Sequence, residues 1–240
     1  MTSRVAVVVG ASGGLGRALL TRLAAEPGRA FVVGVGRRRP ADWPSAPRTP
    51  FIEADLLDET ALAALAETLS GMGVVDLILI ATGLLHEDGV TPEKTMRAIG
   101  AETLCRLFEV NAILPSLVAK HLAPLLPRDE ASVLAALSAR VGSIGDNRLG
   151  GWHAYRASKA ALNMIFRCQA LELRRERPRA VCVVLHPGTV ATALSAPFAK
   201  SSRAMISADD AAERLLKVLA RLEPADSGEF FAYDGERIPW

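Results

Sequence analysis

The stretch "RVAVVVGASGGLGRALLTRLAAE" (residues 4–26) begins as a valine-rich run and passes through a cluster of glycines into a segment of helical period. The run predicts a buried strand, and the segment after the glycines predicts an amphipathic helix. Glycines in such a turn allow positive φ angles and let backbone N–H groups at the helix N-terminus approach a pyrophosphate. A tight turn with close helix–strand packing would also need glycines, but the surrounding strand, helix and second apolar run favour a dinucleotide site.

Two glycine spacings are present in this turn. It fits GxxxGxG through Gly10, Gly14 and Gly16, and it also fits GxxGxxG through Gly10, Gly13 and Gly16. The glycines alone do not choose between these patterns. The residues of the turn expected to bind the cofactor are Gly10, Ser12, Gly13, Gly14, Leu15 and Gly16.

Beyond the turn, short apolar runs alternate with longer segments of helical period along the whole chain. Strands that are apolar throughout and separated by helices are typical of a parallel sheet covered on both faces. The sequence therefore predicts an α/β fold, with one doubly wound sheet of about seven strands and a single domain over residues 1–240. We expect strands at residues 4–10, 30–36, 49–55, 75–81, 132–138, 180–186 and 229–235. We expect helices around residues 15–26, 59–70, 101–126, 153–176 and 208–222, and a surface loop over 37–50.

Composition excludes several classes of partner. A net charge of +2 gives no electrostatic basis for binding nucleic acid or an anionic membrane. The most apolar internal run, residues 74–85, is short and contains Asp76, so it predicts a buried strand and no membrane span. The four histidines lack metal-site spacing, and no metal is expected. The three cysteines suit free thiols in the core of a cytoplasmic protein; they are Cys105, Cys168 and Cys182.

The end of the second predicted strand bears on the choice of coenzyme. A carboxylate at that point would bind the adenosine ribose, whereas basic residues would accept a 2′-phosphate. Arg37, Arg38 and Arg39 occur there, with no acid before Asp42. Because arginine binds phosphate bidentately, Arg37 and Arg38 favour NADP(H) over NAD(H), although arginines also occur as solvated loop residues.

The segment Tyr155-Arg-Ala-Ser-Lys159, taken together with the glycine turn, resembles the short-chain dehydrogenase/reductase family over nearly the whole chain. This resemblance implies a Rossmann-type fold and a catalytic set of Asn111, Ser138, Tyr155 and Lys159. The phrases "LSARVGSIGDNRLGGWHAYRASKAALN" and "LHPGTVATALSAPF" are most similar to the C-factor and sniffer-like carbonyl reductase branch. The resemblance further implies cofactor contacts from Asp55, Leu56, Ala81, Thr82, Gly83, Asn111, Tyr155, Lys159, Pro187, Gly188, Val190 and Thr192.

Two departures from the family pattern stand out. Ala81-Thr82-Gly83 occupies the place of the usual Asn-Asn-Ala-Gly, so the hydrogen bonds of those asparagines are in doubt. Ser138 lies 17 positions before Tyr155, a wider gap than usual. Ser143 is closer in sequence, but the predicted strand end favours Ser138, and the longer loop over 142–152 is then expected to help form the substrate pocket.

The chemistry explains why these residue types occur together. Carbonyl reduction needs a general acid near the substrate oxygen, and a free tyrosine, with a pKa near ~10, exchanges protons poorly at neutral pH. Lys159 is four residues from Tyr155 on one helix face, where an ammonium lowers the tyrosine pKa and, by the resemblance, binds the cofactor ribose. The Ser138 hydroxyl would polarise the carbonyl. For Asn111, the resemblance implies that it helps to hold a water near the lysine.

Three functions remain open on the sequence. The leading one is an NADP-dependent oxidoreductase acting on the carbonyl or secondary alcohol of a small or medium apolar compound. The second is a dinucleotide-binding sensor or signalling protein with little turnover. The third, an epimerase or dehydratase of the extended branch, fits less well because only about fifty residues follow His186. Helices 101–126 and 153–176 are expected to form a homodimer or homotetramer, although buried helix faces in a monomer look the same.

Overall fold

The computed structural model describes residues 3–44, 46–197 and 205–240. Seven strands form one sheet, all pairs are parallel, and the order is β3-β2-β1-β4-β5-β6-β7. The strands are β1 (Arg4–Val9), β2 (Phe31–Gly36), β3 (Phe51–Glu53), β4 (Val74–Ile80), β5 (Ser132–Leu137), β6 (Ala180–His186) and β7 (Phe230–Ala232). The predicted α/β fold with a doubly wound parallel sheet is confirmed.

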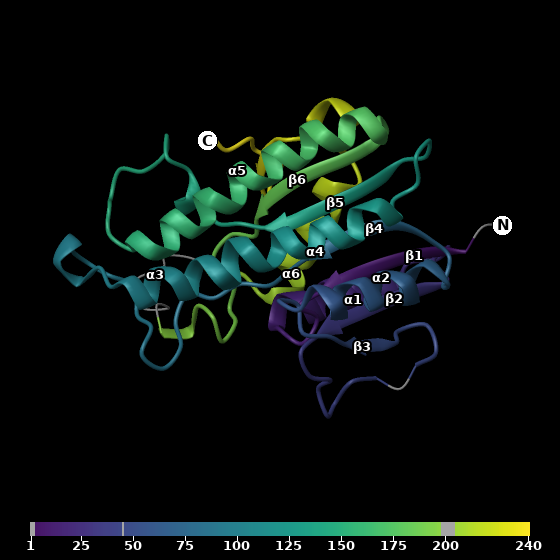
Figure 1. The fold of residues 1–240 in the computed structure, drawn as a ribbon, viewed down its shortest axis with the longest axis horizontal. Coiled ribbons are helices and arrows are strands. Elements are labelled where there is room, and N and C mark those ends of the chain that lie inside the picture. Colours follow the sequence, from purple (N-terminus) through teal and green to yellow (C-terminus); the bar gives the residue numbers. More distant parts are fainter. Residues whose placement is uncertain (1–2, 45, 198–204) are drawn as a thin grey trace.

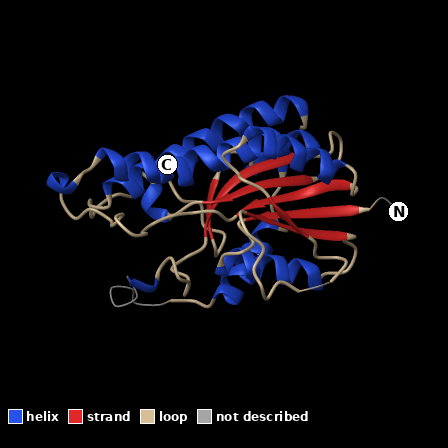
Figure 2. Cartoon of the chain, turned by 60° about the horizontal axis from the view of Figure 1, so that its bottom comes forward, coloured by secondary structure: helices blue, strands red, loops and turns tan. Residues whose placement is uncertain are grey.

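Helices cover both faces of this sheet, as Figures 1 and 2 show. One face packs against α1 (Gly14–Ala25) and α6 (Ala208–Leu219), and the other against α2 (Glu59–Ser70), α4 (Leu114–Leu122) and α5 (His153–Glu176). Successive strand residues point to opposite faces, so β1 contributes Val7 to one core and Val8 to the other. This two-sided burial accounts for strands that are apolar at every position.

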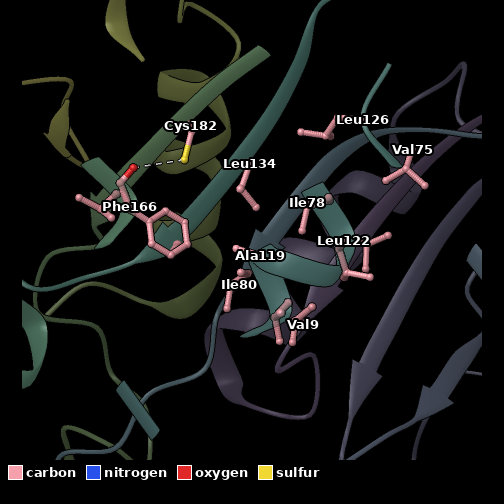
Figure 3. Packing of buried hydrophobic residues seen from close by; sticks show 14 of the residues in the cluster. Val9, Val75, Ile78, Ile80, Ala119, Leu122, Leu126, Leu134, Phe166 and Cys182 are labelled. Atoms are coloured by element: carbon pink, nitrogen blue, oxygen red, sulfur yellow. Dashed lines mark hydrogen bonds between the residues drawn. The ribbon is translucent and has the colours of Figure 1, made fainter. Parts of the chain in front are cut away.

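The larger core lies between the sheet and α2, α4 and α5. Figure 3 shows Ile78 and Ile80 of β4 beside Ala119 and Leu122 of α4, with Phe166 of α5 nearby. These five side chains are all at most 1% exposed. Burying each of the large ones stabilises the fold by about 2–3 kcal/mol before the entropy cost, so this layer holds the helices that carry the site.

The predicted helix around 101–126 is confirmed as an unbroken helical run from Ala101 to Leu125, but the run changes helix type along its length. The pieces are α3 (Ala101–Phe108), the π-helical turn η2 (Glu109–Ile113), α4 (Leu114–Leu122) and the 3₁₀ turn η3 (Ala123–Leu125). Pro115 has no N–H to donate to the carbonyl four residues back, which belongs to Asn111. A proline at this point explains why the helix widens into a π-turn at Asn111.

Several other elements are shorter than predicted. Strands β3 and β7 have three residues each, and α6 ends at Leu219.

The prediction that all three cysteines lie in the core is wrong. Cys105 and Cys168 are exposed on their helices, and only Cys182 is in the core, because a helix places some small apolar residues on its outer face. None of the helices in the described ranges combines the length and apolarity that a bilayer crossing requires. The prediction for the loop at 37–50 is confirmed over its described residues, since no helix or strand occurs there.

Candidate active site

A cavity of about 820 Å³ opens along the carboxyl ends of the central strands. Its walls come from the turns after β1, β4, β5 and β6 and from the start of α5. The strand order reverses between β1 and β4, which is where doubly wound sheets bind ligands. The predicted site residues in its lining are Gly13, Gly14, Leu15, Gly16, Ala81, Thr82, Gly83, Ser138, Tyr155, Lys159, Pro187, Gly188, Val190 and Thr192.

The glycine turn forms one end of the cavity, and three of its glycines lie close to neighbouring atoms. Gly10 has φ +82°, and a Cβ there would meet the backbone of Ala81 at 3.0 Å. A Cβ on Gly16 would lie 2.3 Å from the Gly10 carbonyl oxygen, which is a clash. At Gly14, a Cβ would lie 3.1 Å from the Thr192 side chain, so this glycine keeps the gap between the two walls open. A backbone cradle at a helix N-terminus fits a pyrophosphate.

Seven predicted cofactor residues lie outside the cavity lining, and one of them, Asn111, is described below. The other six are Gly10, Ser12, Arg37, Arg38, Asp55 and Leu56. They follow β1, β2 and β3, so they lie along the same edge of the sheet. Arg37 and Arg38 are exposed at the end of β2. The ion pair with Arg106 and, less strongly, the charge of Arg37 hold the pKa of Glu87 below its usual range, which places Arg37 near that carboxylate.

Tyr155 and Lys159 lie in the first turns of α5, and both are buried. Their side chains are 7% and 3% exposed, and both line the cavity. Burial raises the pKa of Tyr155 above its ordinary value and lowers the pKa of Lys159 to about 7. The lysine Nζ donates a hydrogen bond to the Leu137 carbonyl at the end of β5, 2.9 Å away. The pKa of Tyr155 is therefore raised, whereas the sequence predicted that Lys159 would lower it.

Ser138 follows β5 directly, and its hydroxyl has a partner that the sequence reasoning missed. Its Oγ donates to Oδ1 of Asn163 at 2.6 Å, and both residues are buried. The Asn163 Nδ2 donates to the Gly142 carbonyl at 3.4 Å, which fixes the orientation of the amide. Tyr155, Lys159 and Asn163 are spaced four apart on α5, so the spacing that identified the first pair could also have identified the third.

Ser143, the alternative serine, is outside the cavity lining. Its hydroxyl donates to the Pro239 carbonyl, and the Gly145 N–H donates to the Trp240 carbonyl at 2.7 Å. Pro239 and Trp240 therefore hold the beginning of the loop over 142–152, and Trp240 itself stacks on Phe230. Among the two serines, only Ser138 is positioned to face a ligand in the cavity.

Asn111 is fully buried and lies behind the cavity wall. Its side chain accepts from the Leu84 N–H and donates to the Leu84 carbonyl, each at 2.8 Å, and its Nδ2 also donates to Ser158 Oγ at 3.1 Å. A Cβ on Gly83 would be 3.6 Å from Lys159 Nζ and 3.7 Å from Asn111 Oδ1, so both side chains lie beside this glycine. Asn111 thus fixes the turn after β4 against α5.

Thr82 shows the effect of the missing asparagines. Its Oγ1 is buried and has no hydrogen-bond partner. Its methyl group lies 3.1 Å from the position of a Cβ on Gly10. The backbone turn expected here is present, but the side chain adds no hydrogen bond to the glycine turn.

The far wall of the cavity carries an unusual backbone. Gly150, Gly151 and Trp152 all have positive φ, and Trp152, with φ 51° and ψ 42°, is the one non-glycine residue of this kind in the described ranges. The left-handed region costs a non-glycine residue about 1–2 kcal/mol. The indole ring lies 6.2 Å from the Tyr155 ring in an edge-to-face arrangement. The strain therefore places an aromatic wall beside the tyrosine.

Two curated relatives resemble this chain at the sequence level. C-signal from Myxococcus xanthus is 39% identical over 137 residues, which are 57% of this chain and 78% of that protein. The 1-hydroxy-2-glutathionyl-2-methyl-3-butene dehydrogenase of Rhodococcus sp. is 32% identical over 201 residues, which are 83% of this chain and 84% of that protein. One relative is thus named for a signal and the other for a dehydrogenation.

Two solved structures have the same fold over the full length of both chains. Carbonyl reductase Sniffer of D. melanogaster has a TM-score of 0.84 at 23% identity, with 100% of each chain covered. A short-chain dehydrogenase/reductase from Burkholderia multivorans with bound NADP has a TM-score of 0.80 at 29% identity, again with 100% of each chain covered.

The family model described as short chain dehydrogenase matches residues 4–203, which include the glycine turn, Ser138, Tyr155 and Lys159. This range is most of the chain, and it agrees with the fold and with the C-signal and dehydrogenase relatives. The chain therefore belongs to the short-chain dehydrogenase/reductase family of oxidoreductases.

Proposed function

We propose that the protein is an NADP(H)-dependent oxidoreductase that interconverts a carbonyl and an alcohol, with Asn111, Ser138, Tyr155 and Lys159 as its site. The observation that carries this proposal is the continuous cavity between the glycine turn and the buried Tyr155, Lys159 and Ser138. A dinucleotide bound at the turn would extend toward the tyrosine, and a nicotinamide cofactor would supply the hydride.

Tyr155 is the group that would give a proton to the substrate oxygen. Because burial raises its pKa, the phenol keeps its proton near neutral pH, which suits the direction of carbonyl reduction. Lys159, whose pKa burial lowers to about 7, would gain charge when an anionic cofactor binds beside it. That charge would then favour the phenolate that remains after proton transfer.

Ser138 has one hydroxyl proton, which Asn163 Oδ1 accepts in this structure. To polarise a substrate carbonyl, the hydroxyl would turn and donate that proton to the carbonyl oxygen. Asn111 would act through the Leu84 backbone and Ser158, whose Oγ donates to the Tyr155 carbonyl at 2.9 Å. This chain of contacts supports a role for Asn111 in fixing the first turns of α5. The proposal also keeps the role that the family resemblance implies for Asn111, which is to help hold a water near Lys159.

NADP(H) is the proposed coenzyme because Arg37 and Arg38 are exposed at the end of β2 with no ion pair in the described ranges. The neighbouring carboxylate of Glu53 accepts from the Arg39 backbone N–H at 2.7 Å, so it has a structural partner. The Burkholderia multivorans structure with bound NADP supports the same choice.

A homodimer or homotetramer is proposed from apolar side chains on the outer face of α5 and the π-turn. Met164, Leu171 and Ile113 are 64%, 43% and 48% exposed. Light scattering would measure the mass, and Met164→Glu should shift an oligomer toward monomer. A monomeric wild-type protein would contradict this part of the proposal.

The function is tested with NADPH and a panel of ketones and aldehydes, by following NADPH oxidation. Tyr155→Phe should lower kcat by about 10²- to 10⁴-fold, because it removes the general acid. Tyr233→Phe is a matched control, since Tyr233 is the other of the two tyrosines and lies outside the cavity lining. Equal rates in wild type and Tyr155→Phe would exclude Tyr155 as the acid.

A sensor or signalling protein with little turnover is the second candidate, favoured by the likeness to C-signal and by the unpartnered Thr82 hydroxyl. It predicts tight NADPH binding in calorimetry with no oxidation across the whole panel. Turnover of any member of the panel at more than about 1 s⁻¹, an ordinary enzymatic rate, would count against it.

A further inference from the structure

The wall of the cavity formed by residues 140–156 carries an excess of positive charge. Three arginines in this segment line the cavity, namely Arg140, Arg148 and Arg156. Asp146 is the one carboxylate in the lining. The other side chains of this wall are mainly apolar, and they include Leu149 and Trp152.

Arg140 is already neutralised within the protein. Its Nη2 donates to Glu236 at 2.8 Å, and its Nη1 donates to Asp146 at 3.3 Å. Asp146 is thereby engaged and is not paired with the other two arginines. Arg148 and Arg156 form no ion pair in the described ranges, and the residues outside those ranges include no Asp or Glu.

Arg156 is held in a fixed orientation beside the predicted acid, Tyr155. Its Nε donates to the Gly151 carbonyl at 3.0 Å, and its Nη1 donates to the Val141 carbonyl at 3.3 Å. A guanidinium has five N–H groups, so three remain for a ligand. Arg156 is half-buried, and this partial burial lowers the pKa of its guanidinium. A partly buried charge without a counter-ion is costly, and an anion that binds there removes that cost.

The phosphates of a dinucleotide do not account for these two arginines. The glycine turn follows β1 and Arg37 follows β2, whereas the segment 140–156 follows β5. In the order β2-β1-β4-β5, two strand spacings, about 10 Å, separate β1 from β5, and three spacings, about 14 Å, separate β2 from β5. Arg148 and Arg156 therefore border the substrate end of the cavity.

We propose that the substrate is a carbonyl compound, or its alcohol, with an apolar body and an anionic group, and that Arg156 and Arg148 bind this anion. The inference rests on the proposed function and narrows its substrate class. Arg156 provides a preorganised donor set for a carboxylate or a phosphate. Arg148 is exposed at the rim and attracts the anion to the cavity. The apolar body contacts Leu149, Trp152 and the neighbouring wall.

The test compares acids with their neutral methyl esters as substrates of the full chain with NADPH. Benzoylformate, 3-benzoylpropionate and 4-benzoylbutyrate vary the distance between the ketone and the carboxylate. A second arm compares 4-acetylphenyl phosphate with 4-methoxyacetophenone, which distinguishes a phosphate group from a carboxylate. Wild type should prefer at least one anion over its neutral partner by about tenfold or more in kcat/KM, and added salt should reduce the preference.

Arg156→Gln should lower kcat/KM for that anion by about 10- to 100-fold, mainly through KM, and change the neutral partner by less than about threefold. Arg148→Gln should reduce the effect of added salt on the preference for the anion in kcat/KM. Arg175→Gln is the matched control, because Arg175 is exposed on the same helix and outside the cavity lining. The KM for NADPH should stay constant in all three variants.

Two results would overturn the inference while leaving the oxidoreductase proposal intact. One is a wild type that reduces the neutral compounds as well as the anions. The other is an Arg156→Gln variant that loses both classes equally, which would assign this arginine only to holding the loop. If no compound is reduced, the proposed function fails, and calorimetric titration of the NADPH-bound protein with 3-benzoylpropionate decides the inference. Binding that is lost in Arg156→Gln would support it, and absence of binding would refute it.

Discussion

Asn163 offers the sharpest test of how the site is positioned. Its Oδ1 accepts the Ser138 hydroxyl at 2.6 Å in a buried setting, and the Gly142 carbonyl keeps the amide from rotating. Asn163→Leu keeps the branching of the side chain at Cγ but cannot accept a hydrogen bond. The Ser138 hydroxyl would then lose its fixed partner and rotate among several orientations.

The structure sets the size of the expected effect. A buried polar group that loses its partner costs about 1–3 kcal/mol, so the free energy of unfolding should fall by about 2 kcal/mol. The same loss of positioning should reduce kcat about 10- to 100-fold, because tenfold corresponds to about 1.4 kcal/mol. The KM for NADPH should hardly change, since Asn163 is not in the cavity lining.

A double-mutant cycle with Ser138→Ala is the assay. If Asn163 acts only through Ser138, the double variant should be no slower than Ser138→Ala alone, with a coupling energy of about 1.4–2.8 kcal/mol in kcat. Denaturant unfolding of each variant verifies that the assayed protein is folded. Additive losses in kcat would refute the reasoning, as would an Asn163→Leu variant as active as wild type.

Three further predictions follow from other contacts. Arg37→Gln should raise the KM for NADPH by about tenfold and leave the KM for NADH unchanged, measured by steady-state kinetics; equal changes for both would exclude a 2′-phosphate contact. Gly16→Ala should lower the free energy of unfolding by more than about 2 kcal/mol because its Cβ meets a carbonyl oxygen at 2.3 Å, whereas Gly14→Ala should fold normally and bind NADPH more weakly in calorimetry. Burial, followed by the charge of Arg140, lowers the pKa of His186 to about 4. Between pH 6.5 and 4 the imidazole is therefore protonated in the unfolded chain and neutral in the folded protein. Stability should therefore fall by up to about 3 kcal/mol as pH drops through that window, and His186→Asn should flatten this part of a pH-dependent unfolding curve.

The parts of the fold that follow from local patterns were predictable from the sequence. Apolar runs gave all seven strands, and the glycines placed the turn after β1. The π-turn at Asn111 was not predicted, although Pro115 was a visible signal for it. The exposure of Cys105 and Cys168 was also missed, because composition does not determine which face of a helix is covered.

The candidate site was predictable where a family motif covers it and less so where the contacts are long-range. Tyr155 and Lys159 are four residues apart, so their shared face follows from helix geometry. The pairing of Ser138 with Asn163 joins residues 25 apart, and the sequence offered only the repeated spacing on α5 as a signal. The contact between Gly145 and Trp240 has no local signal in the sequence, because it depends on the path that the chain takes after β7.

That last contact has a practical consequence for anyone who expresses the protein. Because the Trp240 carbonyl accepts the Gly145 N–H, an affinity tag fused after Trp240 would begin against the loop that borders the substrate cavity. A tag in that position risks altering KM for reasons unrelated to catalysis. The amino end of β1, at Arg4, lies across the sheet from the cavity, so a tag, a fluorophore or a surface anchor is better attached on that side.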